Sequence, residues 1–280
     1  MTNNKSLSSS LVRPTVAGAA VVKSPGAAPM LRRRLQSALF PLIDAKYPPL
    51  THALRLRYNV TLRQGEAELR HVGCLVDRSR AAADIGAHRG VYAYVLAHYA
   101  KHVHAFEPHP QLCTYLRRVM SDRVTVHPVA LSSTVGTVKF RIPRAGSYLG
   151  LGQGTLEELP LFHGAAVSEI DVRASTLDQE LQEPVGFMKI DVEGHELSVL
   201  EGGRELLRKQ QPALMIEIAD SPELQHYQRV VDFLAGFGYR AFWLDRGAIV
   251  SVARRGPGAA FFRAAGPKGE VLCANFIFLA

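Results

Sequence analysis

Residues 83–90 read ADIGAHRG and stand directly before the apolar stretch VYAYVLAHYA. An aspartate and two glycines between an alanine run and an apolar stretch indicate a tight turn from a strand into a helix. Glycine adopts backbone conformations closed to other residues, so such a turn lets a ligand approach the backbone closely. An ordinary surface turn fits these eight residues equally well, and the surrounding elements must separate the two interpretations.

Strand and helix patterns alternate on both sides of this turn. Strand-like runs end near Asp84 and Glu107 and continue in VTVHPVAL, GFMKIDVE, PALMIEIA, YRAFWLD and NFIFLA, with a hairpin expected at GTVKFRIP. Helix-like segments are VYAYVLAHYA, PQLCTYLRRVM, HELSVLEGGRELLRK and SPELQHYQRVVDFLAGFG. Regular alternation predicts an α/β fold, with a largely parallel sheet covered by helices on both faces. Ligands of such sheets bind outside the carboxyl ends of the strands.

The net charge of the chain is concentrated at its beginning. Residues 1–70 carry 11 basic and 3 acidic side chains, whereas residues 71–280 carry 22 of each. A nucleic-acid enzyme needs basic residues around its cleft to neutralise phosphates, so the neutral body argues against a nucleic-acid partner. No apolar run is long enough to span a bilayer. With no secretory leader pattern, we expect a cytoplasmic protein without stable membrane insertion.

Composition predicts three regions. Residues 1–29 are rich in small residues and are expected to be a disordered tail. Residues 30–71 form an extension, with an amphipathic helix in LRRRLQSALFPLI and a pair of short strands around 56–76. The helix either lies on an anionic membrane surface or packs on the protein body, and we favour packing. Residues 72–280 form the main domain.

The cysteines and most histidines have no motif spacing. Cys74, Cys113 and Cys273 form no CxxC pair, so we expect buried reduced thiols rather than a disulfide framework or zinc site. The lone tryptophan, Trp243, is expected to pack on a late strand. Surface or hydrogen-bonded core positions, rather than metal ligation, are expected for four histidines: His98, His102, His104 and His109.

The acidic residues at two strand ends select the cofactor. Asp84 stands where a dinucleotide site has the first glycine of G-x-G-x-x-G, and its carboxylate would repel a pyrophosphate. It suits a ligand that carries an ammonium and a sulfonium group. Gly86 and Gly90 would let the backbone approach that ligand, and Glu107 would accept hydrogen bonds from both ribose hydroxyls. These features favour S-adenosylmethionine over NAD.

Several motifs resemble the FkbM family of S-adenosylmethionine-dependent methyltransferases. They are DIGAHRG, AFEP, HPVALSSTVGTVKF, STLDQE, MKIDVEGHELSVLEGG and PALMIEI, and the resemblance covers roughly residues 80–280. It implies the class I methyltransferase fold, a Rossmann-like, doubly wound sheet of seven mostly parallel strands with the last antiparallel. It also implies methyl transfer to a hydroxyl oxygen of a sugar, polyketide or similar small molecule or glycan.

The resemblance also implies which residues hold the cofactor. The methionine part lies against the first turn and the ribose on Glu107, while the segment after the third strand borders the adenine. The residues implied are Asp84, Gly86, Ala87, Gly90, Glu107, Ala130, Leu131 and Asp191. The family commonly reads G-A-N after the first strand, and this chain has His88 in place of the asparagine. We expect an altered hydrogen bond there, with cofactor binding retained.

The stretch KIDVEGHE carries the candidate catalytic groups. Alternation places Lys189, Asp191 and Glu193 on one side of a strand. We expect Asp191 to orient the acceptor and cofactor. His195 is the candidate general base, since an imidazole titrates near neutral pH. Glu193 or Glu217 would alternatively take the proton or orient His195.

Structural interpretations of the same residues stay open. Glu193 and His195 would cap the following helix, and Lys189 with Glu217 would form a buried ion pair. Asp191, Glu193 and His195 are also metal-ligand types, but they lack an obvious complete oxygen shell, so we expect no required metal.

Two other functions fit the sheet. One is an NAD(P)-type oxidoreductase, and the other is a non-catalytic nucleotide-binding module. The acceptor is not specified by any motif. We expect GSYLGLGQGT and LEELPLFHGAA, between core strands, to form a lid over the cleft.

Overall fold

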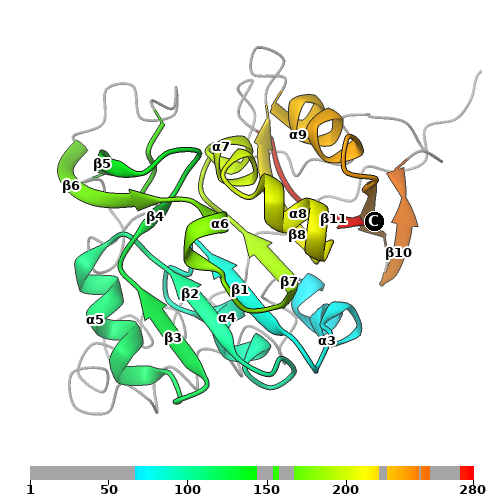
Figure 1. Cartoon of the computed structure of the whole chain (residues 1–280), viewed down its shortest axis with the longest axis horizontal. Coiled ribbons are helices and arrows are strands. Elements are labelled where there is room, and N and C mark those ends of the chain that lie inside the picture. Colours follow the sequence, from blue (N-terminus) through cyan, green and yellow to red (C-terminus); the bar gives the residue numbers. More distant parts are fainter. Residues whose placement is uncertain (1–66, 144–153, 158–166, 221–225, 246, 253–271) are drawn as a thin grey trace, which may run out of the picture. The chain divides into compact units, whose positions relative to one another are not determined.

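The computed structural model describes residues 67–143, 154–157, 167–220, 226–245, 247–252 and 272–280 (Figure 1). The predicted tail at 1–29 and the predicted helix in 31–43 lie outside these residues. The strands predicted around 56–76 are wrong where the structure describes them. A 3-10 turn, Ala67–Arg70, and a helical turn, α3 (Val72–Leu75), occupy that stretch. Helical spacing buries both Leu69 and Val72 in one core cluster, which alternation would not.

The main sheet has eight strands in the order β10-β9-β11-β8-β7-β1-β2-β3. Neighbouring pairs among β8, β7, β1, β2 and β3 are parallel, whereas β11 is antiparallel to both β8 and β9. The predicted mostly parallel sheet with an antiparallel last strand is therefore present. The edge strand β10 was not predicted. The strands are β1 (Ala81–Ile85), β2 (Val103–Phe106), β3 (Val124–His127), β7 (Val185–Ile190), β8 (Ala213–Asp220), β9 (Arg240–Asp245), β10 (Ala248–Ser251) and β11 (Leu272–Leu279).

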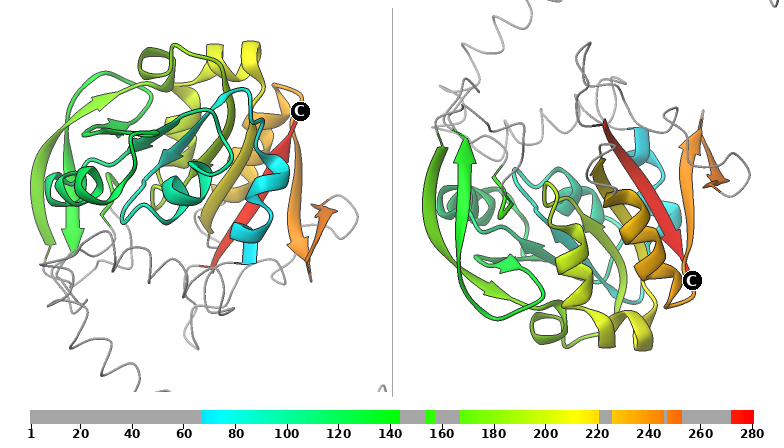
Figure 2. Two further views of the ribbon diagram at one scale, coloured as in Figure 1. Left: turned by 90° about the horizontal axis from the view of Figure 1, so that it is seen from below. Right: turned by 90° about the horizontal axis from the view of Figure 1, so that it is seen from above.

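Helices cover both faces of this sheet, as the alternating pattern predicts. Figure 2 shows α3 and α4 on one face and α7, α8 and α9 on the other. The predicted helix HELSVLEGGRELLRK is divided at Gly202 and Gly203, since glycine is a poor helix former. The helices are α4 (Val91–Leu96), α5 (Pro110–Val119), α6 (Leu177–Glu180), α7 (Glu196–Glu201), α8 (Arg204–Gln210) and α9 (His226–Ala235).

A second, three-stranded sheet has the order β4-β6-β5. The run VTVHPVAL, predicted as one strand, is split between the two sheets into β3 and β4 (Ala130–Leu131). Pro128 separates the two parts, since proline has no N–H for a ladder. GTVKFRIP forms the single strand β5 (Gly136–Pro143), and its antiparallel partner is β6 (Val167–Ser175).

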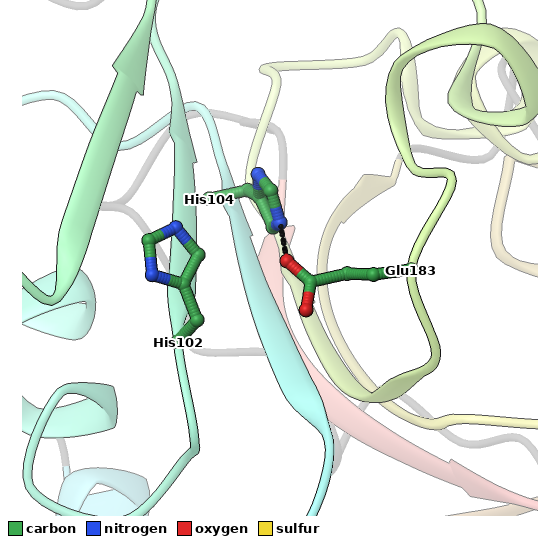
Figure 3. Close-up of side chains that lie close together, drawn as sticks. All are labelled: His102, His104 and Glu183. Atoms are coloured by element: carbon green, nitrogen blue, oxygen red, sulfur yellow. Dashed lines mark hydrogen bonds and ion pairs between the residues drawn. The ribbon is translucent and has the colours of Figure 1, made fainter.

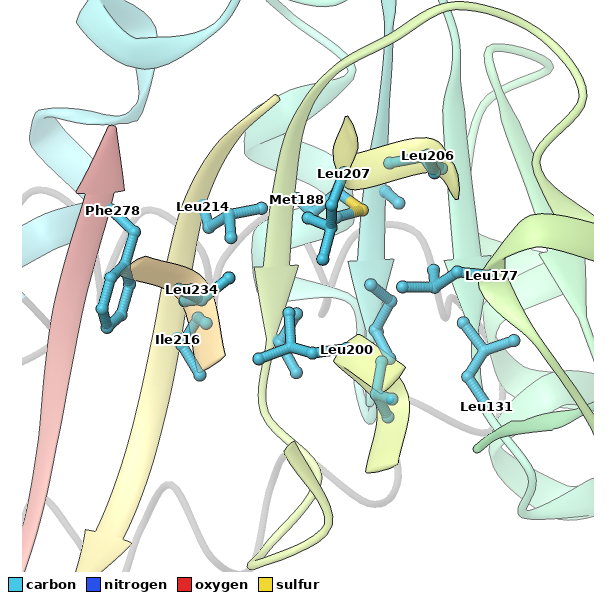
Figure 4. Close-up of a cluster of buried hydrophobic side chains, with 14 of the residues drawn as sticks. Leu131, Leu177, Met188, Leu200, Leu206, Leu207, Leu214, Ile216, Leu234 and Phe278 are labelled. Carbon is cyan, nitrogen blue, oxygen red and sulfur yellow. The ribbon is translucent and has the colours of Figure 1, made fainter. Parts of the chain in front are cut away.

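The largest hydrophobic cluster lies between the main sheet and the helices α7, α8 and α9. Strand residues such as Met188, Leu214 and Ile216 contact Leu200 and Leu234 from the helices (Figure 4). Strand β1 is buried along its whole length, as expected for a central parallel strand covered on both faces. This core fixes the positions of β1, β2, β7 and β8, and therefore the edge of the sheet at which their carboxyl ends lie.

Several single-residue predictions are decided by burial. Trp243 packs against the large core cluster, as predicted. Cys113 is buried and free, but Cys74 is exposed, so the prediction of a buried thiol is wrong there because its helical turn points it outward. The side chain of Cys273 lies outside the described residues. None of the described helices has both the length and the apolarity needed to cross a membrane.

Candidate active site

A cavity of about 290 Å³ lies at the carboxyl ends of the parallel strands. This volume lies just below the usual range of ligand pockets, about 300–1,000 Å³. The predicted site residues that line it are Gly86, Glu107, Ala130, Leu131, Asp191, Glu193, His195 and Glu217. Asp84, Ala87 and Gly90 are not among its lining residues. The fold therefore gathers eight of the predicted residues around one cavity.

The turn after β1 is shaped by two glycines with positive φ. Gly86 has φ 81°, and a Cβ atom there would lie 1.8 Å from the carbonyl oxygen of Asp191. Gly90 has φ 75°, and its Cβ would lie 2.0 Å from Cε of Met120. Gly86 thus lets β1 and the end of β7 meet at the cavity. Gly90 lets the start of α4 pack against the end of α5.

Asp84 supports this turn from behind the cavity. The residue is 2% exposed, and its Oδ2 accepts a 2.7 Å hydrogen bond from the backbone N–H of Ala93 in the first turn of α4. Burial raises the pKa of Asp84 to about 7, although the charge of Lys189 and the Ala93 hydrogen bond oppose the rise. The described contacts make Asp84 a helix-anchoring residue, and its contact with a cofactor stays a prediction.

Glu107 presents a buried carboxylate directly to the cavity. Oε2 accepts a hydrogen bond from the backbone N–H of His88, and Oε1 accepts one from that of His109, both at 2.8 Å. Burial raises the pKa of Glu107 to about 7 against these two hydrogen bonds. A carboxylate offers about four acceptor positions, so each oxygen keeps a lone pair for a further donor.

His88, the departure from the family motif, leaves this arrangement intact. Its φ is 49°, in the left-handed region where asparagine is favoured and histidine is tolerated. The contact to Glu107 uses the backbone N–H, which does not depend on the side chain. The substitution therefore keeps the hydrogen bond that orients Glu107.

The lining groups fit S-adenosylmethionine. The free lone pairs of Glu107 match the two ribose hydroxyls, and the apolar surface of Leu112, Ala130 and Leu131 suits an adenine ring. Asp191, at the end of β7, would supply a carboxylate for the cationic part of the molecule.

A buried cation lies beneath these carboxylates. Lys189 is 0% exposed, and its Nζ lies 3.4 Å from Oδ2 of Asp191 and 3.8 Å from Oε2 of Glu217. Nζ also lies 5.0 Å from the centre of the Tyr92 ring. The predicted ion pair between Lys189 and Glu217 is confirmed. Since β7 ends at Ile190 and Glu193 has φ 52°, strand alternation does not extend to Glu193.

His195 is held by hydrogen bonds on both ring nitrogens. Nδ1 lies 2.6 Å from Oε1 of Glu157, and Nε2 lies 2.9 Å from Oγ of Ser132. His195 occupies the N-cap position of α7, yet its side chain makes no capping hydrogen bond. Capping therefore does not account for the ring's position at the cavity.

Ser132 and Glu157 were missed as site residues by sequence reasoning. Ser132 belongs to the motif HPVALSSTVGTVKF, which points to this region without singling out a residue. Nothing in LEELPLFHGAA distinguishes Glu157 from its neighbour Glu158. Thr155, two residues earlier, donates a hydrogen bond from Oγ1 to the carbonyl of Glu193 at 2.8 Å. Part of the predicted lid segment thus contacts the loop that carries the candidate base.

Glu193 has the most strongly altered acidity of the lining groups. Burial raises its pKa to about 8, and the nearby charges of Asp191, Glu217 and Glu196 raise it further. The carboxyl is therefore largely protonated at pH 7. This favours His195 over Glu193 as the group that accepts a proton.

We expect the stability of the chain to fall as pH rises between about 4.5 and 8. In this window the unfolded chain has lost the Glu193 proton, whereas the folded chain still holds it, so deprotonation favours unfolding. Glu193→Gln should reduce the fall in unfolding free energy by on the order of 3 kcal/mol, since each pKa unit corresponds to about 1.4 kcal/mol.

Urea unfolding of the protein without cofactor at pH 5 and pH 8.5 measures this effect. Glu205→Gln, which changes an exposed carboxylate on α8, is the matched control. Its unfolding free energy should fall with pH as steeply as that of wild type. An equal slope in wild type and Glu193→Gln would show that Glu193 ionises normally.

Comparison with known proteins identifies the family to which the chain belongs. The sequence model described as the Methyltransferase FkbM domain matches residues 84–241, more than half of the chain. No curated protein matches the sequence.

Three solved structures resemble the chain. Methyltransferase FkbM from Methylobacillus flagellatus KT is 16% identical, with a TM-score of 0.47, over 90% of this chain and 60% of that one. The protein SMU.1697c of Streptococcus mutans, in complex with SAH, is 10% identical with a TM-score of 0.42, over 76% and 96%. An rRNA methylase from Streptococcus thermophilus is 12% identical with a TM-score of 0.41, over 76% and 93%. The chain therefore spans less than two thirds of the Methylobacillus protein.

The match to the family covers the turn after β1, both acidic strand ends and the stretch KIDVEGHE. It decides between the predicted cofactors in favour of S-adenosylmethionine, and against the NAD(P)-type oxidoreductase. The chain belongs to the FkbM family of S-adenosylmethionine-dependent methyltransferases.

Proposed function

We propose that this methyltransferase acts on a hydroxyl oxygen of a small molecule or glycan, such as a sugar or a polyketide. The observation that carries this proposal is the arrangement of His195 between Glu157 and Ser132 at the cavity. A hydroxyl must lose its proton as its oxygen is methylated, so an oriented base beside the cavity is the group that such a reaction needs.

The hydrogen bonds of His195 define its tautomer. A 2.6 Å contact between Nδ1 and a carboxylate oxygen requires a proton on Nδ1. The hydrogen bond to His195 lowers the pKa of Glu157, which keeps that carboxylate ionised at neutral pH. In the neutral imidazole with its proton on Nδ1, Nε2 carries a lone pair that accepts from the Ser132 hydroxyl. An acceptor hydroxyl that displaces Ser132 would find the same lone pair.

When bound, S-adenosylmethionine would supply the methyl group from its positively charged sulfur; the acceptor oxygen would bond to this methyl as the bond to sulfur breaks, with the electron pair staying on sulfur. His195 takes the hydroxyl proton on Nε2, and Glu157 stabilises the imidazolium that results. Asp191 orients the reacting groups at the end of β7. The proposed assignment also includes Glu193 and Glu217, whose carboxyl groups line the same cavity.

The proposed cofactor contacts divide into two groups. Gly86, Glu107, Ala130, Leu131 and Asp191 line the cavity and would touch the cofactor. The remaining three, Asp84, Ala87 and Gly90, would act by shaping the turn after β1. The latter assignment follows from the hydrogen bonds of Asp84 to Ala93 and of Gly90 to the Ala87 carbonyl.

Calorimetric titration with S-adenosylmethionine tests the cofactor site. Glu107→Gln should weaken binding by roughly 10–100-fold, because hydrogen bonds to a charged group contribute about 1.5–3 kcal/mol. Glu205→Gln, on the exposed face of α8, should bind as wild type. Unchanged affinity of Glu107→Gln for S-adenosylmethionine would show that Glu107 does not bind the ribose.

A methyl-transfer assay over a panel of hydroxylated acceptors tests the acceptor class. We expect an O-methyl ether, identified by the mass and the carbon chemical shift of the new methyl group. A product methylated on nitrogen or carbon would contradict the proposal even if cofactor binding is as expected.

A further inference from the structure

A second cluster of ligand-type side chains lies away from the cavity. His102 directly precedes β2, His104 is its second residue, and Glu183 lies two residues before β7 (Figure 3). One ligand atom from each of these three residues lies within 4.8 Å of the others. Since β2 and β7 are both parallel to β1, the cluster is at the amino ends of the strands, whereas the cavity is at their carboxyl ends.

The His104 ring is oriented from two sides. Nε2 lies 2.7 Å from Oε1 of Glu183, and Nδ1 lies 3.0 Å from Nε2 of His127 on β3. One proton is shared between the two imidazoles. In one tautomer His104 donates Nε2–H to Glu183 and accepts from His127, and no further cation is needed. In the other, Nδ1–H donates to His127, and the Nε2 lone pair facing Glu183 is available to a metal ion.

His102 is fixed in the same way by its neighbour on β3. Its Nε2 lies 2.9 Å from Oγ1 of Thr125, and its ring packs edge-on against that of His104 at 4.9 Å between centres. Metal-binding histidines are commonly held by such outer hydrogen bonds, which set the ring orientation. His127 and Thr125 therefore act as outer partners for the two candidate ligands.

We propose that His102, His104 and Glu183 bind a zinc ion. Two imidazoles and one carboxylate suit a borderline-soft divalent ion better than magnesium or calcium. Tetrahedral bonds of about 2.0–2.2 Å need ligand atoms about 3.3 Å apart. The His104–Glu183 contact would open slightly and His102 would move closer, which their partly buried positions permit. Water would take the fourth position.

The proposed ion would tie the start of β2 to the segment before β7. These two strands flank β1 and pair with it on opposite sides. Binding only to the folded chain raises its stability by mass action. The proposed site would thus serve the fold rather than the methyl-transfer reaction, and it differs from the expectation that His102 and His104 are not ligands.

Zinc titration of the full chain, free of affinity tags and treated with a chelator, tests the proposal. We expect one ion per chain, a rise in melting temperature on saturation, and a tetrahedral visible spectrum with Co²⁺. His104→Ala and Glu183→Gln should each weaken zinc binding beyond the roughly 10–100-fold that loss of an outer partner costs. They should also abolish the rise in melting temperature.

Two control variants locate the site. His98→Gln changes an exposed histidine after α4 and should bind zinc as wild type. His195→Gln should also bind zinc normally, which separates this site from the cavity. Circular dichroism checks folding, and His102→Gln replaces any variant that fails to fold. Absence of stoichiometric binding, or equal affinity in wild type and in folded variants of His104 or Glu183, would overturn the proposal.

Discussion

Replacing His195 by glutamine is expected to lower kcat for methyl transfer by roughly 10²–10⁴-fold, the usual contribution of a positioned general base. The glutamine keeps polar atoms near Ser132 and Glu157 but cannot accept a proton at neutral pH. Because His195 lies at the cavity wall and caps nothing, the fold should tolerate the change. Affinity for S-adenosylmethionine should stay within a few-fold, so that kcat falls without loss of cofactor binding.

Steady-state kinetics with the acceptor found in the screen, together with calorimetry, checks this result. His98→Gln is the matched control, since its exposed ring contacts only the segment around Tyr94 among the described interactions. Glu157→Gln should lower kcat less than His195→Gln and should change the pH profile, because Glu157 acts through the imidazole. A kcat within threefold of wild type in His195→Gln would show that His195 is not the general base, and Glu217 or Glu193 would then be the candidate.

Lys189→Met is expected to destabilise the chain by about 3–5 kcal/mol, as removal of one partner from a buried ion cluster commonly does. Nζ of Lys189 lies within 4 Å of the Asp191 and Glu217 carboxylates, and its charge opposes the raised pKa of Asp84. Without it, the buried carboxyl of Asp84 would bind a proton more readily. The loss of stability should therefore grow as pH rises.

Urea unfolding at pH 6 and pH 8 measures both effects. Lys209→Met, which removes an exposed ion pair with Glu205 on α8, should change stability by no more than about 1 kcal/mol. The double variant Lys189→Met/Asp84→Asn should recover part of the loss, because an amide still accepts from Ala93 but carries no charge. A Lys189→Met variant as stable as wild type would show that the cluster is solvated.

Much of the fold was predictable because local patterns and global topology agree. Strand β1, buried throughout, and helix α5, which begins at Pro110, follow directly from apolar runs and from proline at a helix start. The predictions of secondary structure were wrong where tertiary packing, rather than the local sequence pattern, determined the conformation. VTVHPVAL contributes to two sheets, and residues 67–75 are helical because packing of Leu69 and Val72 outweighs local alternation.

The candidate site was predictable on the strand ends and not elsewhere. Asp84, Glu107 and Asp191 stand at fixed positions relative to strands, so their positions at one edge of the sheet follow from parallel pairing. Glu157 and Ser132 reach His195 across 38 and 63 residues of sequence. No rule of sequence spacing predicts contacts over such separations. The loops between the two sheets determine which of these residues meet.

By itself, the sequence determined the α/β alternation, the turn after β1, the acidic strand ends and the family motifs, because each depends on residues close together in the chain. The tertiary structure alone decided that Asp84 anchors α4 from behind the cavity, that Lys189 contacts Asp191 as well as the expected Glu217, and that His102, His104 and Glu183 meet at the opposite edge. The contacts of Lys189 with Glu217 and of His104 with Glu183 join residues distant in sequence. Only packing of strands and loops brings their charges within interaction distance, where burial then sets their acidity.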